Sequence, residues 1–202
     1  MLSVIKYFCI KDPKKAEETV LEFAEYLRGN LDSLLHNELI TFDKELRQVE
    51  NYLKIEKKRF EEKLNIVYDI KIRNFMLPVL TLQPLVEIAV RHGVTKTEDG
   101  GTITISTEEN NNEFIVTVTD DSNLWFGAGF DVQDDRPSFQ GGTSLQGGTS
   151  PEGHIHAEIE KVRNRLLAMC GGFLEVQSKP GEGTTAIITI PKKEIIYEHP
   201  GG

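Results

Sequence analysis

The apolar periodicity of the chain changes at about residue 64, and this change constrains the fold more than any other feature. Before it, apolar residues recur every three or four positions, as they do in amphipathic helices. After it, short β-rich runs alternate between apolar and polar residues and are separated by turns rich in Gly, Asn and Pro. A chain of 202 residues with this order predicts a helical segment followed by one mixed α/β domain.

Two amphipathic helices are predicted in the N-terminal part. Asp12-Pro13 suits a helix start, because Asp caps free amides and Pro is tolerated at the first helical position. Gly29 and Asn30 weaken the end of this helix, and Thr41 can cap the next one. The apolar stripe of the first helix consists of Val20, Phe23, Ala24, Leu27 and Leu31, and that of the second helix consists of Leu46, Val49, Tyr52, Leu53 and Phe60. Charged residues from Lys54 to Glu62, Glu56 among them, predict a solvated face. Because such a helix pair has little core of its own, we expect it to pack against a partner such as a second copy.

The remainder predicts an α/β arrangement with one long loop. The expected elements are a strand at Asn65–Ile72, a helix at Leu82–His92 capped by Gly93, a hairpin of Thr102–Thr107 with Phe114–Thr119, a helix at Glu152–Met169, and strands at Phe173–Gln177 and Thr184–Ile190. Residues 120–153 form the loop, which contains a duplicated Gln-Gly-Gly-Thr-Ser. Loops of this length are usually functional lids or disordered, and the duplication itself is most simply a flexible repeat.

The charge and the cysteines exclude several classes of protein. A formal net charge of −9 argues against binding to nucleic acid or to an anionic membrane. Cys9 and Cys170 are too few for a disulfide framework and fit a reducing compartment. No long apolar stretch predicts a membrane span, and the N-terminus lacks the features of a signal peptide. We therefore expect a cytoplasmic protein.

Three segments carry candidate chemistry. Glu87 and Arg91 lie four apart on one predicted helix face with His92 beside them, an arrangement that a surface ion pair would also explain. Asp120 ends a strand and precedes Gly127 and Gly129, and such a strand end with a Gly-rich loop lets a backbone approach a nucleotide. The third segment, Ser178-Lys-Pro-Gly-Glu-Gly-Thr184, is by itself only a turn before a strand.

In this order, the motifs resemble those of the ATP-binding domain of sensor histidine kinases, within the superfamily shared with gyrase and with a major heat-shock chaperone. The subfamily is similar to the LytS/YehU type, and the resemblance covers nearly the whole chain. It rests on Glu50-x-Tyr52-Leu53-x-Ile55-x-x-x-Arg59-Phe60, on Leu77-Pro78 through Gly93, on Asp120 onward, on Val162-Arg-Asn-Arg-Leu166 and on Gly181-Glu-Gly-Thr184. The implied fold is a Bergerat-type α/β sandwich over residues 64–197, preceded by a partial helical dimerisation segment and linker over 1–63 and followed by a tail over 198–202.

The resemblance also implies roles for particular residues. Asp120 would accept a hydrogen bond from the adenine amino group, and Thr184 would help to hold the base. Gly127 and Gly129 would let the chain pass close to it. Glu87 would orient the attacking group or accept its proton, with Arg91 and His92 near the phosphates. The implied reaction is transfer of the ATP γ-phosphoryl to a histidine, with Mg²⁺ offsetting charge, and then to a response regulator.

The chain departs from the family pattern at four places. The phosphoacceptor histidine would lie just upstream of Leu2, and His36 does not match it, so we expect a truncated form of a longer receptor. Ile88 replaces the asparagine that supplies an oxygen to Mg²⁺. Ser122–Phe126 interrupts the Asp-Gly motif, and His156–Lys161 stands where a second glycine motif is expected. These changes leave open an alternative, a non-catalytic pseudokinase or a redesigned interaction module on the same fold.

Overall fold

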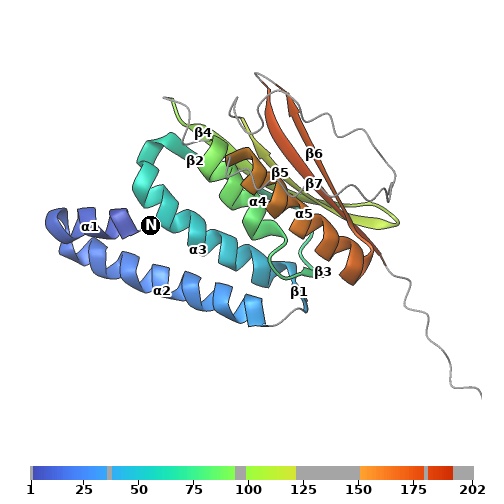
Figure 1. Cartoon of the computed structure of the whole chain (residues 1–202), viewed down its shortest axis with the longest axis horizontal. Helices are drawn as coiled ribbons and strands as arrows, with labels where there is room; N and C mark the ends of the chain where they lie inside the picture. Colours follow the sequence, from blue (N-terminus) through green and yellow to red (C-terminus); the bar gives the residue numbers. More distant parts are fainter. Residues whose placement is uncertain (1, 36–37, 94–98, 122–150, 180–181, 193–202) are drawn as a thin grey trace, which may run out of the picture.

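The computed structural model describes residues 2–35, 38–93, 99–121, 151–179 and 182–192 (Figure 1). Five strands form the main sheet: β2 (Leu64–Ile70), β4 (Gly101–Glu109), β5 (Glu113–Asp120), β6 (Phe173–Lys179) and β7 (Gly183–Pro191). Their order across the sheet is β2-β4-β5-β7-β6, with β2 parallel to β4 and the other neighbours antiparallel. Both predicted strand pairs, β4 with β5 and β6 with β7, are therefore confirmed, and the sheet is mixed.

The helices account for the rest of the architecture. In chain order they are α1 (Leu2–Lys11), α2 (Pro13–Leu35), α3 (Phe42–Phe60), the short η1 (Glu61–Lys63), α4 (Leu82–Ile88), the π-helical turn η2 (Ala89–Gly93) and α5 (Pro151–Cys170). Helices α3, α4 and α5 lie on one face of the sheet, while α2 runs along the outer side of α3 and α1 folds back on α2 (Figure 1). Among the described residues, no helix combines the length and apolar character needed to cross a bilayer.

The main core lies between the sheet and these three helices. Alternate residues of the strands face it, and aligned pairs such as Ile105 with Val118 and Val118 with Ala186 are fully buried. Ile155, Ile159, Val162 and Leu166 are spaced four, three and four residues apart on α5 and form an apolar stripe that is buried in the same cluster. Helix α3 contributes Leu46, Val49, Tyr52 and Leu53 to this core as well, so the predicted linker helix packs directly on the sheet side of the molecule.

A second, two-stranded sheet joins the linker to the start of α4. Strand β1 (Leu39–Thr41) pairs antiparallel with β3 (Met76–Pro78), and neither strand was expected from periodicity. Thr41 then caps α3 as predicted, because its side chain accepts a hydrogen bond from the Lys44 backbone N–H. The short sheet thus fixes the N-terminal end of α3 beside the chain segment that leads into α4.

Helix α2 continues past Gly29 and Asn30, which were expected to weaken its end, to Leu35. Two sequence-based expectations about the helices were wrong. The segment predicted as one helix from Leu82 to His92 is α-helical only to Ile88 and then widens into the π turn η2, a feature that is frequent at functional sites. Glu56 is buried rather than solvated, with 4% exposure, and it pairs with Arg59 on the same helix at 3.5 Å.

The face of α2 that packs on the rest of the fold is also shifted by one residue from the apolar stripe predicted for this helix. Ala16 and Thr19 are buried and Phe23 and Tyr26 are half-buried, so this face packs inward. The remaining members of the predicted stripe, Val20, Ala24, Leu27 and Leu31, are exposed. Helix α2 therefore has two faces with apolar residues, one covered within the chain and one open.

Candidate functional site

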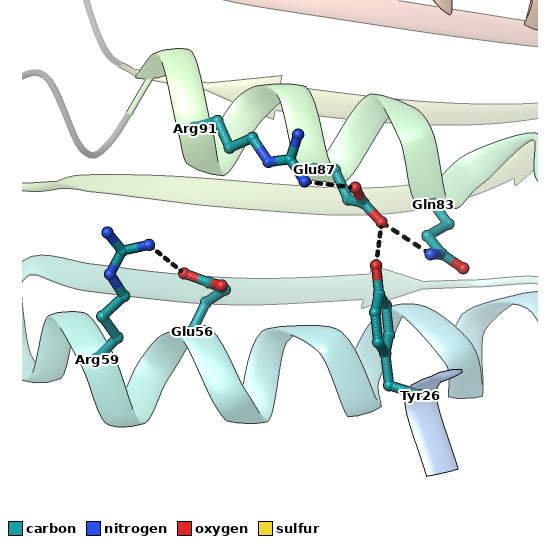
Figure 2. Close-up of polar contacts among 6 residues, drawn as sticks. All are labelled: Tyr26, Glu56, Arg59, Gln83, Glu87 and Arg91. Carbon is teal, nitrogen blue, oxygen red and sulfur yellow. Dashed lines mark hydrogen bonds and ion pairs between the residues drawn. The ribbon is translucent and has the colours of Figure 1, made fainter. Parts of the chain in front are cut away.

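Glu87 lies on α4 at the centre of a polar cluster (Figure 2). Its Oε1 accepts hydrogen bonds from the Tyr26 hydroxyl at 2.7 Å and from Gln83 Nε2 at 2.8 Å. Its Oε2 accepts one from Arg91 Nη2 at 3.2 Å. The predicted Glu87–Arg91 pair is therefore formed, and it is an ion pair across one helical turn. The Glu87 side chain is 17% exposed and Arg91 is 59% exposed, so the cluster opens to solvent on the Arg91 side.

The start of α4 is held by two charged side chains from neighbouring helices. Glu45 of α3 is fully buried and accepts hydrogen bonds from the backbone N–H groups of Leu80, Leu82 and Gln83, at 3.2, 3.0 and 3.3 Å. Arg165 of α5 donates from Nη1 to the carbonyl oxygens of Val79 and Leu80, at 3.0 and 2.8 Å. Free N–H groups at a helix start need acceptors, and Glu45 supplies them from another element.

Asp120 and Thr184 form a second polar position at the end of the sheet. They lie opposite each other on β5 and β7, and each is 1% exposed. The Thr184 hydroxyl donates to Ser178 Oγ on β6 at 3.0 Å. All three residues belong to a row of the sheet that begins with Ile103 on β4 and lies on the helix-covered face. A buried acid at a strand end is uncommon in proteins and marks a candidate binding position.

Glycine at position 183 is required by the approach of β7 to β5. Gly183 has φ +86°, and a Cβ atom there would lie 2.0 Å from the Asp120 carbonyl oxygen. No other residue could therefore begin β7 beside Asp120 without moving one strand. The neighbouring Asp121 is exposed, and its Oδ1 accepts a hydrogen bond from the Thr102 N–H at 2.6 Å, which ties the end of β5 to β4.

The two positions are connected through η2. Helix α4, which carries Glu87, continues directly into η2, and η2 packs against β4 and β5. Strand β5 ends at Asp120, so the turn that follows Glu87 contacts the strand that carries the candidate base-binding acid. The backbone of His92 belongs to this turn, while its side chain lies outside the described part of the structure.

Ile88 does not fit a metal ligand. Its side chain is 1% exposed and belongs to the apolar core, and it has no oxygen or nitrogen atom to offer to Mg²⁺. Within the described part of the chain, no group of three or more His, Cys, Asp or Glu side chains is arranged to hold a metal ion. His154 and His156, on α5, are both exposed.

Several sequence-predicted features lie outside the described residues. These are Gly127, Gly129, the Ser122–Phe126 interruption and the duplicated Gln-Gly-Gly-Thr-Ser. The segment that replaces the second glycine motif is described, and it lies in the middle of α5, where Glu160 pairs with Arg163.

The sequence did not predict five of the residues that form the polar contacts around Glu87, at the start of α4 and beside Thr184. Gln83 could have been found from its i, i+4 spacing to Glu87. No local signal pointed to Tyr26, Glu45 or Arg165, because their partners lie on other elements. Ser178 lies in the third candidate segment, but the sequence assigned it no role. The Tyr26 and Glu87 residues, for example, are 61 positions apart in the sequence.

Two family profiles match the chain. Residues 1–64 match the family described as Histidine kinase. Residues 77–194, more than half of the chain, match the family described as Histidine kinase-, DNA gyrase B-, and HSP90-like ATPase. The second match contains Glu87, Asp120 and Thr184.

Curated relatives match over much of the chain. YwpD of Bacillus subtilis (strain 168) is 33% identical over 181 residues, which are 89% of this chain and 60% of YwpD. The sensor histidine kinase YpdA of Escherichia coli (strain K12) is 38% identical over 110 residues, 54% of this chain and 19% of YpdA. The sensor protein LytS of Staphylococcus haemolyticus (strain JCSC1435) is 30% identical over 187 residues, 91% of this chain and 30% of LytS. The chain thus spans less than two thirds of each of these relatives.

The fold is also found among solved structures. The catalytic domain of the histidine kinase ThkA, in a nucleotide-free form, superposes with a TM-score of 0.50 at 17% identity. The superposition covers 78% of this chain and 96% of that domain. At this identity the similarity establishes the fold alone, a mixed sheet layered with helices, as the sequence predicted.

Proposed function

The chain belongs to the family of histidine kinase-, DNA gyrase B- and HSP90-like ATPases, and from this premise we propose that it binds ATP and transfers the γ-phosphoryl group to a histidine. Its catalytic domain is of the sensor histidine kinase type, by the family match and the LytS relatives. The observation that carries the proposal is the buried pair of Asp120 and Thr184 at the end of the sheet, next to the turn that follows Glu87.

The adenine end of the nucleotide fits the residues present. Asp120 would accept a hydrogen bond from the amino group of the base, and Thr184 would contribute its hydroxyl. Gly183 keeps β7 paired with the end of β5 at this position, because a Cβ there would lie 2.0 Å from the Asp120 carbonyl oxygen. Gly127 and Gly129 complete the proposed base-binding set. ATP supplies the phosphoryl group, and this end of the site supplies binding and orientation.

Glu87 is the proposed catalytic carboxylate. A carboxylate near the attacking group can orient it or accept its proton. Arg91 and His92 would lie near the phosphates, where a cation offsets negative charge. Arg91 pairs with Glu87 in this structure, so a bound phosphate would compete with that carboxylate for the guanidinium.

The proposed magnesium contact is incomplete at position 88. Because Ile88 is apolar and buried, it cannot supply the oxygen that the resemblance assigns to this position. We therefore propose ATP binding through the base and assign no step of the reaction to a metal held by residue 88.

The proposed partners follow from the family. A response regulator would receive the phosphoryl group, in the cytoplasm, where ATP is available. The helical residues 1–63 would form a homodimer through the open face of α2, on which Leu27 and Leu31 are exposed. The division of the chain into residues 1–63, 64–197 and 198–202 remains a prediction.

Titration of a fluorescent ATP analogue with and without Mg²⁺ tests the proposal. We expect the unmodified chain to bind the analogue with little dependence on Mg²⁺, and Ile88→Asn to bind it more tightly when Mg²⁺ is present, because Asn restores an oxygen ligand. Asp120→Ala serves as the control and should weaken binding in both backgrounds, since it removes the proposed acceptor for the base. Absence of binding by both the unmodified chain and Ile88→Asn would refute the proposal.

A further inference from the structure

Tyr26 connects the helical segment to the proposed catalytic carboxylate. It is carried by α2, outside the segment of residues 77–194 that matches the ATPase family, yet its hydroxyl lies 2.7 Å from Glu87 Oε1. Figure 2 shows the side chain pointing from α2 toward α4, where Glu87 also accepts hydrogen bonds from Gln83 and Arg91. Gln83 and Arg91 lie on the same helix as Glu87 or its continuation, so Tyr26 is the donor that comes from a separate part of the fold.

The Tyr26 ring is held in place by its neighbours. It stacks on Phe23 with ring centroids 6.2 Å apart and an interplanar angle of 17°. It also packs against Tyr52 of α3, with centroids 5.8 Å apart. These aromatic contacts fix the ring between α2 and α3, so the direction of the hydroxyl toward Glu87 is set by packing as well as by the hydrogen bond.

The hydroxyl is a donor at neutral pH. Burial raises the pKa of Tyr26 above its usual value, and the negative charge of Glu87 raises the pKa further. The phenol therefore stays protonated, and its O–H group donates a hydrogen bond to the carboxylate. A hydrogen bond of this kind, to a charged acceptor, is stronger than one between neutral groups.

The bond competes with the chemistry proposed for Glu87. Oε1 already accepts two hydrogen bonds and Oε2 accepts one from a cation. A carboxylate offers about four lone-pair sites, so little acceptor capacity is left for an attacking group. The 17% exposure of the side chain restricts access to what remains.

We propose that Tyr26 restrains the site: with α2 docked, its hydroxyl and Gln83 fill the acceptor sites of Glu87 Oε1, and Tyr26 must leave before Oε1 can accept a hydrogen bond or a proton from the attacking group. The inference rests on the proposed function for the role of Glu87, while the restraint itself is a physical contact that can be measured without turnover. Any movement of α2 away from α3 and α4 would release the carboxylate, so the position of the helical segment controls the site.

Tyr52 provides a matched control within the same cluster. It is a buried tyrosine that packs against Tyr26, but its hydroxyl has no hydrogen-bond partner among the described residues. Replacing either tyrosine with Phe removes one hydroxyl and keeps the ring. Only the Tyr26→Phe change removes a bond to Glu87.

Carbodiimide-driven amidation, read by peptide mass spectrometry, measures the accessibility of Glu87 in the full chain. We expect Tyr26→Phe to raise the labelling rate at Glu87 about fivefold, as for the loss of one hydrogen bond, and Tyr52→Phe to leave the rate unchanged. Labelling of the exposed Glu108 should be equal in all variants and reports on the reagent. An unchanged rate at Glu87 in Tyr26→Phe, or an equal rise in both variants, would overturn the inference.

A second measurement links the restraint to turnover. In the Ile88→Asn background, ATP hydrolysis with Mg²⁺ should rise severalfold on Tyr26→Phe and stay constant on Tyr52→Phe. A fall in Tyr26→Phe would overturn the inference, because Tyr26 would then assist catalysis. If none of the variants binds the nucleotide, the proposed function fails, and the labelling result alone decides whether Tyr26 restrains Glu87.

Discussion

Glu45 is a fully buried carboxylate whose environment acts on it in two opposite directions. Burial raises the pKa of Glu45, while the backbone N–H groups at the start of α4 lower it, and the net shift is upward. A carboxyl whose pKa is higher in the folded state contributes most to stability below the unfolded pKa near 4.5, and the contribution is lost as the pH rises through the folded pKa. The residue therefore links the docking of α3 on α4 to pH.

We expect Glu45→Gln to destabilise the protein by about 1–3 kcal/mol at low pH, because one amide oxygen replaces an acceptor shared by several N–H groups. The difference from the unmodified chain should shrink as the pH rises above about 4.5. Urea unfolding between pH 4 and pH 8, at about half-unit steps, measures this gap. Glu50→Gln, a half-buried site on the same helix, controls for the loss of one charge. A gap that widens with pH would show that the N–H donors outweigh burial.

At the scale of elements, the start of α4 is set by contacts with α3 and α5. Leu80, just before α4, has φ 57°, a left-handed conformation that costs a residue with a side chain roughly 1–2 kcal/mol. Its N–H bonds to Glu45 and its carbonyl bonds to Arg165, so both groups of this strained residue are satisfied from other helices. Contacts from several elements hold the backbone of Leu80 in place, and such contacts allow a strained residue to persist beside a candidate site.

Arg165→Met should therefore lower stability by about 2–3 kcal/mol, because it leaves two carbonyl oxygens without their charged donor. The amides of α4 should also exchange hydrogen faster, since the turn that precedes the helix loses one of its two supports. Urea unfolding and hydrogen exchange followed by mass spectrometry measure the two effects. Lys161→Met, an exposed position on the same helix, should change stability by less than about 0.5 kcal/mol. Equal losses in the two variants would contradict the assigned role of Arg165.

At the scale of the molecule, the open face of α2 is the feature that the single chain does not account for. Leu27 is 49% and Leu31 60% exposed, while the neighbouring face of the same helix packs on the rest of the fold. Exposed apolar stripes on a helix are typical of association surfaces. The face that carries Tyr26 and the face that carries Leu27 are different, so a change on the open face leaves the contact with Glu87 in place.

Leu27→Asp combined with Leu31→Asp should weaken dimerisation about 100-fold or more, because a charge without a partner is costly to bury at an interface. Sedimentation velocity over a range of concentrations should show a dimer for the unmodified chain and a monomer for the double variant. Leu167→Asp places the same charge at an exposed apolar position on α5 and should stay dimeric. A monomeric unmodified chain, or a double variant that still dimerises, would exclude the proposed surface.

Much of the fold could be predicted because its signals are local. The strand pairs 101–120 and 173–191 follow from alternation and short turns, and the cap at Thr41 and the stripe of α5 follow from spacing within one helix. The Glu87–Arg91 pair is equally local, since residues four apart in a helix are neighbours. The pairing of Asp120 with Thr184 was expected only through the family resemblance, and the roles of these residues stay predictions.

The sequence by itself thus determined most of the element types, the family and part of the set of candidate residues, because periodicity, capping and motif order are properties of nearby positions. Only the tertiary structure decided which polar groups meet. Tyr26 reaches Glu87 across 61 residues, Glu45 reaches Leu82 across 37, and Arg165 reaches Leu80 across 85. The exposure of Leu27 depends on which side of α2 packs on α3, and that is settled by the shape of the whole core rather than by the pattern of any single helix.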